Sequence, residues 1–313
     1  MDTSARDCLV LFDTSIGGRL ESGWAAGVLH QRTRTIKAGP MLYVECYPVW
    51  DTRRALAARK EAKKEAHAKA QAKLDAKNRE KKVEYLTNNN FWAGDIILTA
   101  EYPLNGQPDG AEQAKRDIVN FLRRVKDARE KKGLPPIRYI YVTEWTQSEK
   151  YGVRWHHHVI MSGDGMTREE VEAKWTDKHK GFCNSRRAQP NERHLSGFAR
   201  YLTQNKLDRA GRNPQGKAKG RTWGHSRGLK LPAESVADKK ISIRKAGRVA
   251  ETVEDFSQAK EIFERLYPGC ELLEASAKRS EWAAGVYVRA LLRRTDEKPE
   301  KKRRNERGDQ QGG

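Results

Sequence analysis

The sequence is poor in cysteine and contains no long apolar run. Its four cysteines, Cys8, Cys46, Cys183 and Cys270, form no CxxC pair, so neither a disulfide framework nor a zinc ribbon is predicted. No stretch approaches the roughly 20 apolar residues that a membrane-spanning helix needs, and the first residues do not resemble a secretory signal. We therefore expect a cytoplasmic protein that has no membrane partner.

Positive charge dominates the composition. The 313 residues include 62 Lys and Arg against 42 Asp and Glu, which gives a net charge of +20. Such an excess of cations attracts polyanions, above all nucleic acids. Because 37% of the residues are hydrophobic and eight are tryptophan, the chain has enough material for a folded core.

Local patterns along the chain mix strands and helices, which predicts an α+β fold. Residues 1–32 form an N-terminal segment of unclear role, and the charged tail 293–313 is expected to be disordered. Between them, the Ala/Lys/Glu/Arg-rich segment 53–82 predicts a basic insertion, either a solvated helix or the arm of a helical hairpin.

The remaining elements follow from periodicity and turn residues. Strands are predicted over 33–49 (a hairpin), 94–102, 137–145, 153–161, 240–244 and 285–292, and helices near 114–125, 167–174, 192–207 and 257–266.

The run Trp155–Met161 contains three consecutive histidines and is the most informative text in the chain. Alternate side chains of a strand point to one face, so His156 and His158 project together while His157 points away. If 137–145 and 153–161 form an antiparallel hairpin, Glu144 joins the face of His156 and His158. Two imidazoles and a carboxylate can bind a divalent metal and leave positions open for a substrate.

A second candidate is Tyr201, in the helix predicted over 192–207. Tyrosine is a weak nucleophile near neutral pH because its hydroxyl ionises near pH 10. It can attack phosphorus where a metal neutralises the developing charge. Taken alone Tyr201 is a packing residue, and only the neighbouring metal set makes it a candidate nucleophile.

The order Ile97–Tyr102, then His156-x-His158, then a helix bearing Tyr201 resembles the three motifs of HUH endonucleases. These enzymes are the rolling-circle replication initiators of plasmids and single-stranded DNA phages. Further likeness at 221–232, Asn88–Phe91 and 282–294 resembles the replication-associated proteins of Gram-positive phages and plasmids. The resemblance covers most of 33–294.

The resemblance implies an HUH-like nicking domain over 33–292, built as an antiparallel sheet with flanking helices. It implies Mg²⁺ or Mn²⁺ on His156 and His158, with Glu144 as third ligand, and Tyr201 as the nucleophile that forms a 5′-phosphotyrosine and frees a 3′-hydroxyl. Related proteins often carry a lysine three residues after the tyrosine. Here that position is Gln204, so either Gln204 or Lys206 is the auxiliary residue.

The resemblance also implies a single-stranded or locally melted origin as substrate, in a bacterial host cell. DNA contacts are expected at Arg221, Trp223, Arg227 and Lys230, because they interleave charge with an aromatic ring. Residues 211–218 approach a P-loop, but Ala218 stands where a hydroxyl must reach Mg²⁺, so no ATPase is predicted. Host helicase and polymerase are therefore expected partners.

Two alternatives remain open. A single-tyrosine transposase or mobilisation nickase would use the same chemistry for a different product. A non-catalytic basic DNA-binding protein would carry the histidines without using them.

Overall fold

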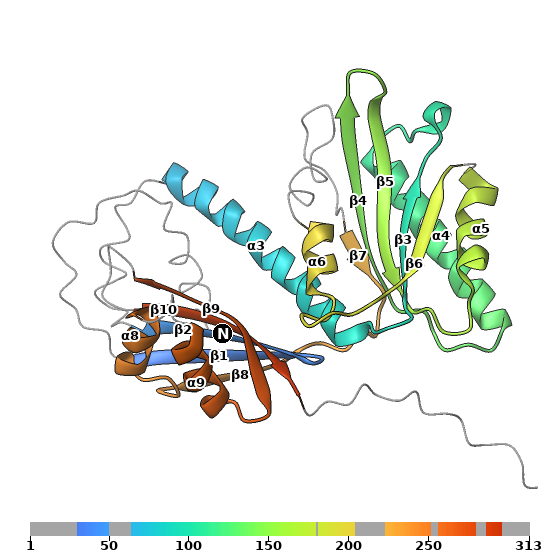
Figure 1. Ribbon diagram of the computed structural model, residues 1–313. Coiled ribbons are helices and arrows are strands. Elements are labelled where there is room, and N and C mark those ends of the chain that lie inside the picture. Colours follow the sequence, from blue (N-terminus) through green and yellow to red (C-terminus); the bar gives the residue numbers. More distant parts are fainter. Residues whose placement is uncertain are drawn as a thin grey trace, which may run out of the picture.

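The computed structural model describes residues 30–49, 64–179, 181–203, 223–251, 256–279 and 286–295. Their strands form two antiparallel five-stranded sheets, called sheet A and sheet B below, with helices packed on both (Figure 1). The predicted α+β class is therefore confirmed. Within the described part of the chain, no helix has the length and apolar character needed to span a bilayer.

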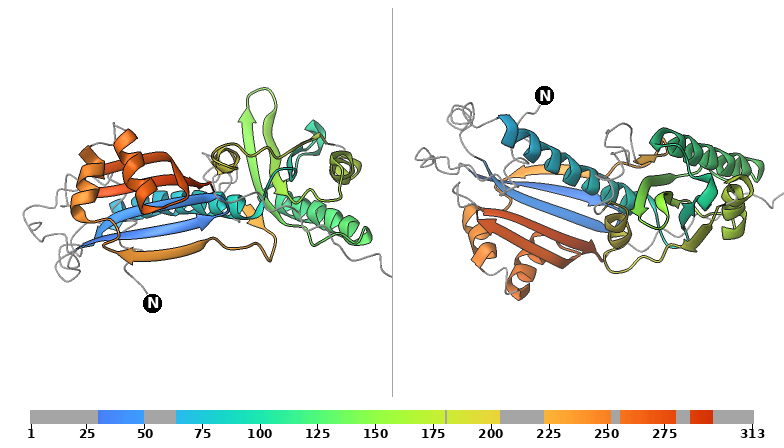
Figure 2. Two further views of the ribbon diagram at one scale, coloured as in Figure 1. Left: turned by 60° about the horizontal axis from the view of Figure 1, so that its bottom comes forward. Right: turned by 90° about the horizontal axis from the view of Figure 1, so that it is seen from above.

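Sheet A gathers strands from both ends of the chain, in the order β8-β1-β2-β10-β9. The predicted hairpin at 33–49 is confirmed: Gly39, with φ 57°, and Pro40 form its turn. Helices α8 and α9 cover one face of this sheet (Figure 2). The elements are β1 (His30–Ala38), β2 (Met41–Val49), β8 (Ala233–Asp238), α8 (Ile243–Glu251), α9 (Phe256–Leu266), β9 (Cys270–Arg279) and β10 (Val286–Arg294).

Sheet B has the order β6-β3-β5-β4-β7. Helices α4 and α5 pack on one face around Phe121 and Trp175, and α6 with its entry packs on the other face through Leu195 and Leu202. The elements are β3 (Ile96–Glu101), the 3-10 turn η1 (Leu104–Gly106), α4 (Ala111–Lys131), β4 (Tyr139–Ser148), β5 (Gly152–Met161), α5 (Arg168–His179), β6 (Cys183–Arg187), α6 (Ser196–Thr203) and β7 (Trp223–His225).

Helix α3 (Lys64–Asn90) joins the two sheets (Figure 1). Its last turns are apolar on two sides: Val83 and Leu86 pack beneath sheet B with α6, and Tyr85 packs on the second face of sheet A. The basic helix expected over 53–82 thus continues to Asn90, because its final turns bury apolar side chains. Residues 53–63 lie outside the described part.

Several local predictions can be compared with the structure. The capping box at the start of α5 is confirmed, since Glu170 N donates to Thr167 Oγ1 and Thr167 N donates to Glu170 Oε2. The strand expected at 240–244 is wrong: Ile241 is buried under α8, and the helix begins at Ile243. Within 33–292 the strands divide between two sheets, and β10 continues to Arg294.

Candidate metal centre and active site

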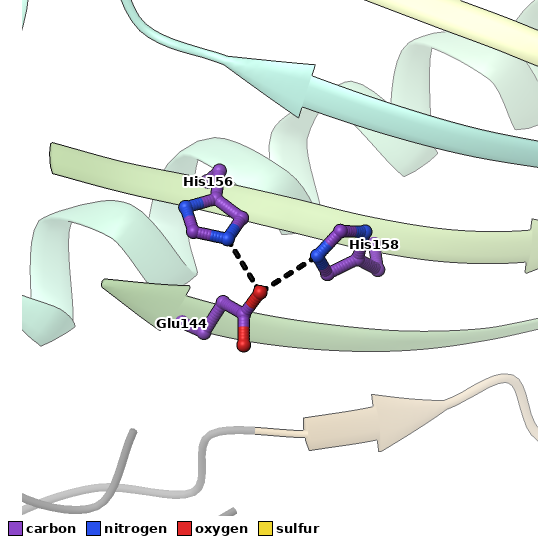
Figure 3. A group of neighbouring side chains, drawn as sticks. All are labelled: Glu144, His156 and His158. Atoms are coloured by element: carbon purple, nitrogen blue, oxygen red, sulfur yellow. Dashed lines mark hydrogen bonds and ion pairs between the residues drawn. The ribbon is translucent and has the colours of Figure 1, made fainter. Parts of the chain in front are cut away.

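The β4–β5 hairpin brings the three expected ligands together. In its register Glu144 pairs with His156, and His158 follows two residues later on the same face. Glu144 Oε1 lies 2.5 Å from His156 Nε2 and 2.7 Å from His158 Nε2 (Figure 3). The three ligand atoms lie within 4.8 Å of one another, so two imidazoles and one carboxylate are aimed at a common point.

The neighbouring strand β3 orients one of these ligands. Thr99 pairs with His158, and the Thr99 Oγ1 atom lies 3.1 Å from His158 Nδ1. A hydrogen bond to the second ring nitrogen holds an imidazole in the orientation that presents Nε2 to a metal. The sequence predictions missed Thr99, although it lies inside the segment 97–102 that carries the family resemblance.

The residues present fit a divalent metal ion. Glu144 and His158 are buried, with 6% and 4% exposure, while His156 is partly exposed and opens the group toward solvent. Nitrogen and oxygen donors in this combination suit borderline and hard divalent cations. Three protein ligands also leave coordination positions for a substrate, as a catalytic site requires.

His157 points to the opposite face, as its odd position in the strand predicts. It is completely buried, with its Nδ1 2.9 Å from Thr143 Oγ1 and its Nε2 3.0 Å from Tyr102 OH. Tyr102 OH donates to Asp117, so His157 Nε2–H donates to the tyrosine oxygen and Nδ1 accepts from Thr143. Burial lowers the pKa of His157 well below its usual value, and the ring is therefore a neutral core residue.

Tyr201 lies beside the metal centre, on α6. Its ring meets the His158 ring edge to face, with ring centroids 5.5 Å apart. Because α6 buries Ala199 and Leu202 against sheet B, Tyr201 falls on the opposite side of the helix and is 54% exposed. An exposed hydroxyl beside a candidate metal centre is accessible to a DNA strand.

The start of α6 is held by the end of α3. Asn88 Oδ1 accepts a hydrogen bond from Leu195 N at 3.0 Å, and Asn88 Nδ2 donates to Ser196 Oγ at 2.7 Å. The preceding residue, His194, adopts a left-handed conformation with φ 53°, and its Nε2 lies 2.9 Å from Phe91 O. Three consecutive residues at the helix entry are thus fixed by the segment 88–91, which determines where Tyr201 stands.

The other expected site residues differ in what the structure describes. Trp223 pairs with Val142 on β7 and packs partly buried against the α6 core, whereas the side chains of Arg227 and Lys230 are exposed. The Lys230 backbone is bound by Asn90 through N–H and C=O. Gln204, Lys206, Arg221 and the segment 211–218 lie outside the described residues.

Comparison with known proteins gives one match. Residues 95–206 match the model of a family described as replication-associated protein ORF2. The matched segment runs from the start of β3 to just beyond α6 and contains Glu144, His156, His158 and Tyr201. No curated protein and no solved structure matches the chain significantly. The family match supports a role in replication initiation, and the Glu/His/His group is compatible with a metal-dependent nuclease.

Proposed function

We propose that this chain is a metal-dependent DNA-nicking endonuclease that initiates rolling-circle replication, with Tyr201 as its nucleophile. The observation that carries the proposal is the contact between the Tyr201 ring and His158, a member of the three-ligand set. Both lie within the segment that matches the replication-associated family. That match favours replication over transposition or plasmid mobilisation, for which the chemistry would be the same.

In the proposed reaction, Tyr201 Oη attacks the scissile phosphorus in line with the departing O3′. The P–O3′ bond breaks as the P–Oη bond forms; the phenol loses its proton and the released O3′ takes one up. The products are a 5′-phosphotyrosine and a free 3′-hydroxyl from which a polymerase can extend. Because one phosphodiester is exchanged for another, no nucleotide cofactor is required, and a 3′-hydroxyl can reverse the step to rejoin the strand.

The side chains around Tyr201 position the reacting groups. Glu144, His156 and His158 would hold the cation, Mg²⁺ or Mn²⁺, and Thr99 orients His158. When bound, such a cation supplies Lewis-acid stabilisation of the charge on the phosphate oxygens. The contribution of the protein is mainly positioning, which lowers barriers to phosphoryl transfer by avoiding loss of entropy at the moment of reaction.

The test is a denaturing-gel assay for covalent protein–DNA adducts. Purified protein is incubated with single-stranded oligonucleotides that tile the origin region of its own replicon, in Mn²⁺ or in EDTA. We expect a Mn²⁺-dependent adduct that Tyr201→Phe abolishes. Tyr151→Phe is the matched control, because Tyr151 is also exposed, at 48%, and lies at the tip of the β4–β5 hairpin.

Two results would contradict the proposal. An adduct that persists in Tyr201→Phe would assign the nucleophile elsewhere. Tight DNA binding without an adduct on any origin-derived strand would favour the non-catalytic DNA-binding protein. Host helicase and polymerase are proposed partners, since the reaction itself neither unwinds nor extends DNA.

A further inference from the structure

Strand β6 forms the edge of sheet B and has two very different sides. On its inner side, Cys183 and Ser185 are buried, and Ser185 N and Oγ both donate to Glu172 Oε1. Arg187 donates to the carbonyl oxygens of Gly94, Gly163 and Met166. These contacts fix the strand against the body of sheet B.

The alternate residues Phe182, Asn184 and Arg186 are all exposed, and Phe182 has 62% of its surface open. Among the residues that the structure describes, their side chains have no hydrogen-bond, ion-pair or ring partner. An exposed phenylalanine and an uncommitted arginine on a rigid strand are available for a ligand.

This outer side belongs to the same face as the candidate metal centre. Asn184 pairs with Thr99, and Thr99 pairs in turn with His158, so the three residues form one row across the sheet. Two strand spacings separate Asn184 from His158, which is about 10 Å. Arg186 lies in the next row, opposite Ile97.

We propose that Phe182, Asn184 and Arg186, the β6 strip, bind single-stranded DNA next to the scissile phosphate. The inference rests on the proposed nicking function, whose substrate it places on the sheet. The Phe182 ring stacks on an unpaired base, the Asn184 amide donates and accepts hydrogen bonds, and the Arg186 guanidinium pairs with a phosphate. Such a combination of aromatic platform and cation is how proteins hold single strands.

The backbone keeps Phe182 at the sheet. A Cβ on Gly181 would lie 2.0 Å from Glu101 O, so only glycine lets the chain pass this close to β3. Phe182 O then accepts a hydrogen bond from Glu101 N at 2.8 Å. The aromatic ring therefore stands on a fixed platform, which limits the conformational entropy lost when a base stacks on it.

Two other occupants fit less well. A peptide that added to β6 as a further strand would need free edge groups, but Ser185 N is bound by Glu172 and Ser185 O accepts from Arg168. Duplex DNA hides its base faces and could not use the Phe182 ring. The nearest acid on this face, Glu101, is 3.6 Å from Arg154, which reduces its repulsion of phosphate.

The experiment measures binding of a fluorescein-labelled oligothymidylate of about 20 nucleotides by anisotropy in EDTA, between about 50 and 200 mM NaCl. Phe182→Ala is expected to weaken binding by about fivefold or more and to leave the salt dependence unchanged, because stacking is not ionic. Arg186→Ala is expected to reduce the slope of log affinity against log salt by about 0.7, the loss of one phosphate contact.

Matched controls are Phe256→Ala, an exposed phenylalanine on α9, and Arg123→Ala, an exposed arginine on α4 behind sheet B. Both should bind like the unmodified protein. The proposal is overturned if Phe182→Ala and Arg186→Ala bind no worse than these controls. It is equally overturned if Phe182→Ala weakens binding of a duplex of the same length as much as binding of the single strand.

The two proposals can fail separately, because binding in EDTA does not require cleavage. Weaker binding by the strip variants, together with no adduct from the unmodified protein, would reject the nickase and keep the strip. A Tyr201-dependent adduct that forms equally well in Phe182→Ala, with binding unchanged, would keep the nickase and reject the strip.

Discussion

Replacing His157 by alanine tests the two-sided character of the histidine strand. The side chain is completely buried behind sheet B, between Thr143 and Tyr102, with its ring edge to face against Trp175 at 5.3 Å. The metal centre lies on the other face. His157→Ala is therefore expected to reduce stability and to leave metal binding intact in the folded protein.

The magnitude follows from what the substitution leaves behind. Thr143 is 3% exposed and its hydroxyl bonds to the imidazole, so that hydroxyl becomes unsatisfied; Tyr102 keeps its bond to Asp117. An unsatisfied buried hydroxyl costs about 1–3 kcal/mol. With the cavity left by the ring, the total loss is about 2–5 kcal/mol.

The assay is urea unfolding followed by circular dichroism, paired with calorimetric titration of Mn²⁺. His156→Ala is the matched variant: its ring is partly exposed and contacts Glu144, so we expect a loss below about 1 kcal/mol in stability but no specific Mn²⁺ binding. If His157→Ala proves as stable as His156→Ala, or loses Mn²⁺ binding to the same degree, the assignment of the two faces is wrong.

Three further predictions concern the surroundings of the site. Asn88→Ala should cost about 2–4 kcal/mol in urea unfolding and reduce adduct yield, because the entry of α6 loses its anchor, whereas Asn89→Ala, with more exposed bonds, should cost less than half as much. Thr99→Val should weaken Mn²⁺ affinity about 10- to 100-fold at nearly unchanged stability; unaltered affinity would contradict the orienting role of Thr99 toward His158. Burial lowers the pKa of His194 to about 4, so the unfolded chain takes up a proton that the folded chain does not between pH 6.5 and 4. Stability should fall with decreasing pH across that window by up to about 1.4 kcal/mol per pH unit, and His194→Asn should reduce this slope by about one proton.

Elements whose signal is local follow from the sequence. The apolar spacing at Ala114, Ile118, Phe121 and Val125 predicts α4, and these side chains form the core beneath sheet B. Strand alternation at 156–158, with the hairpin assumption, places Glu144 beside two histidines, and the structure has that register. Periods of 2 and 3.6 residues depend only on neighbours along the chain, so they can be read without knowledge of the fold.

Burial and long-range partners were decided by the tertiary structure. Alternation turns His157 away from the metal face, but only packing of α4 and α5 makes it a core residue with 0% exposure. The segment 240–244 has a strand-like composition, yet α8 begins there because Ala246 and Val249 complete the core on sheet A. Which strands join which sheet depends on pairings between β1, β8 and β10 that are distant in sequence.

The position of the proposed nucleophile shows the same division. Sequence order makes Tyr201 a candidate, but its place beside His158 is set by Asn88, which bonds to Leu195 across 107 residues of chain. Likewise, the outer side of β6 is exposed only because β3 occupies one edge of that strand and Glu172 and Arg168 close the other. Local periodicity determines the elements and the face of each side chain; contacts between remote segments determine which faces meet, because only the folded chain brings them within bonding distance.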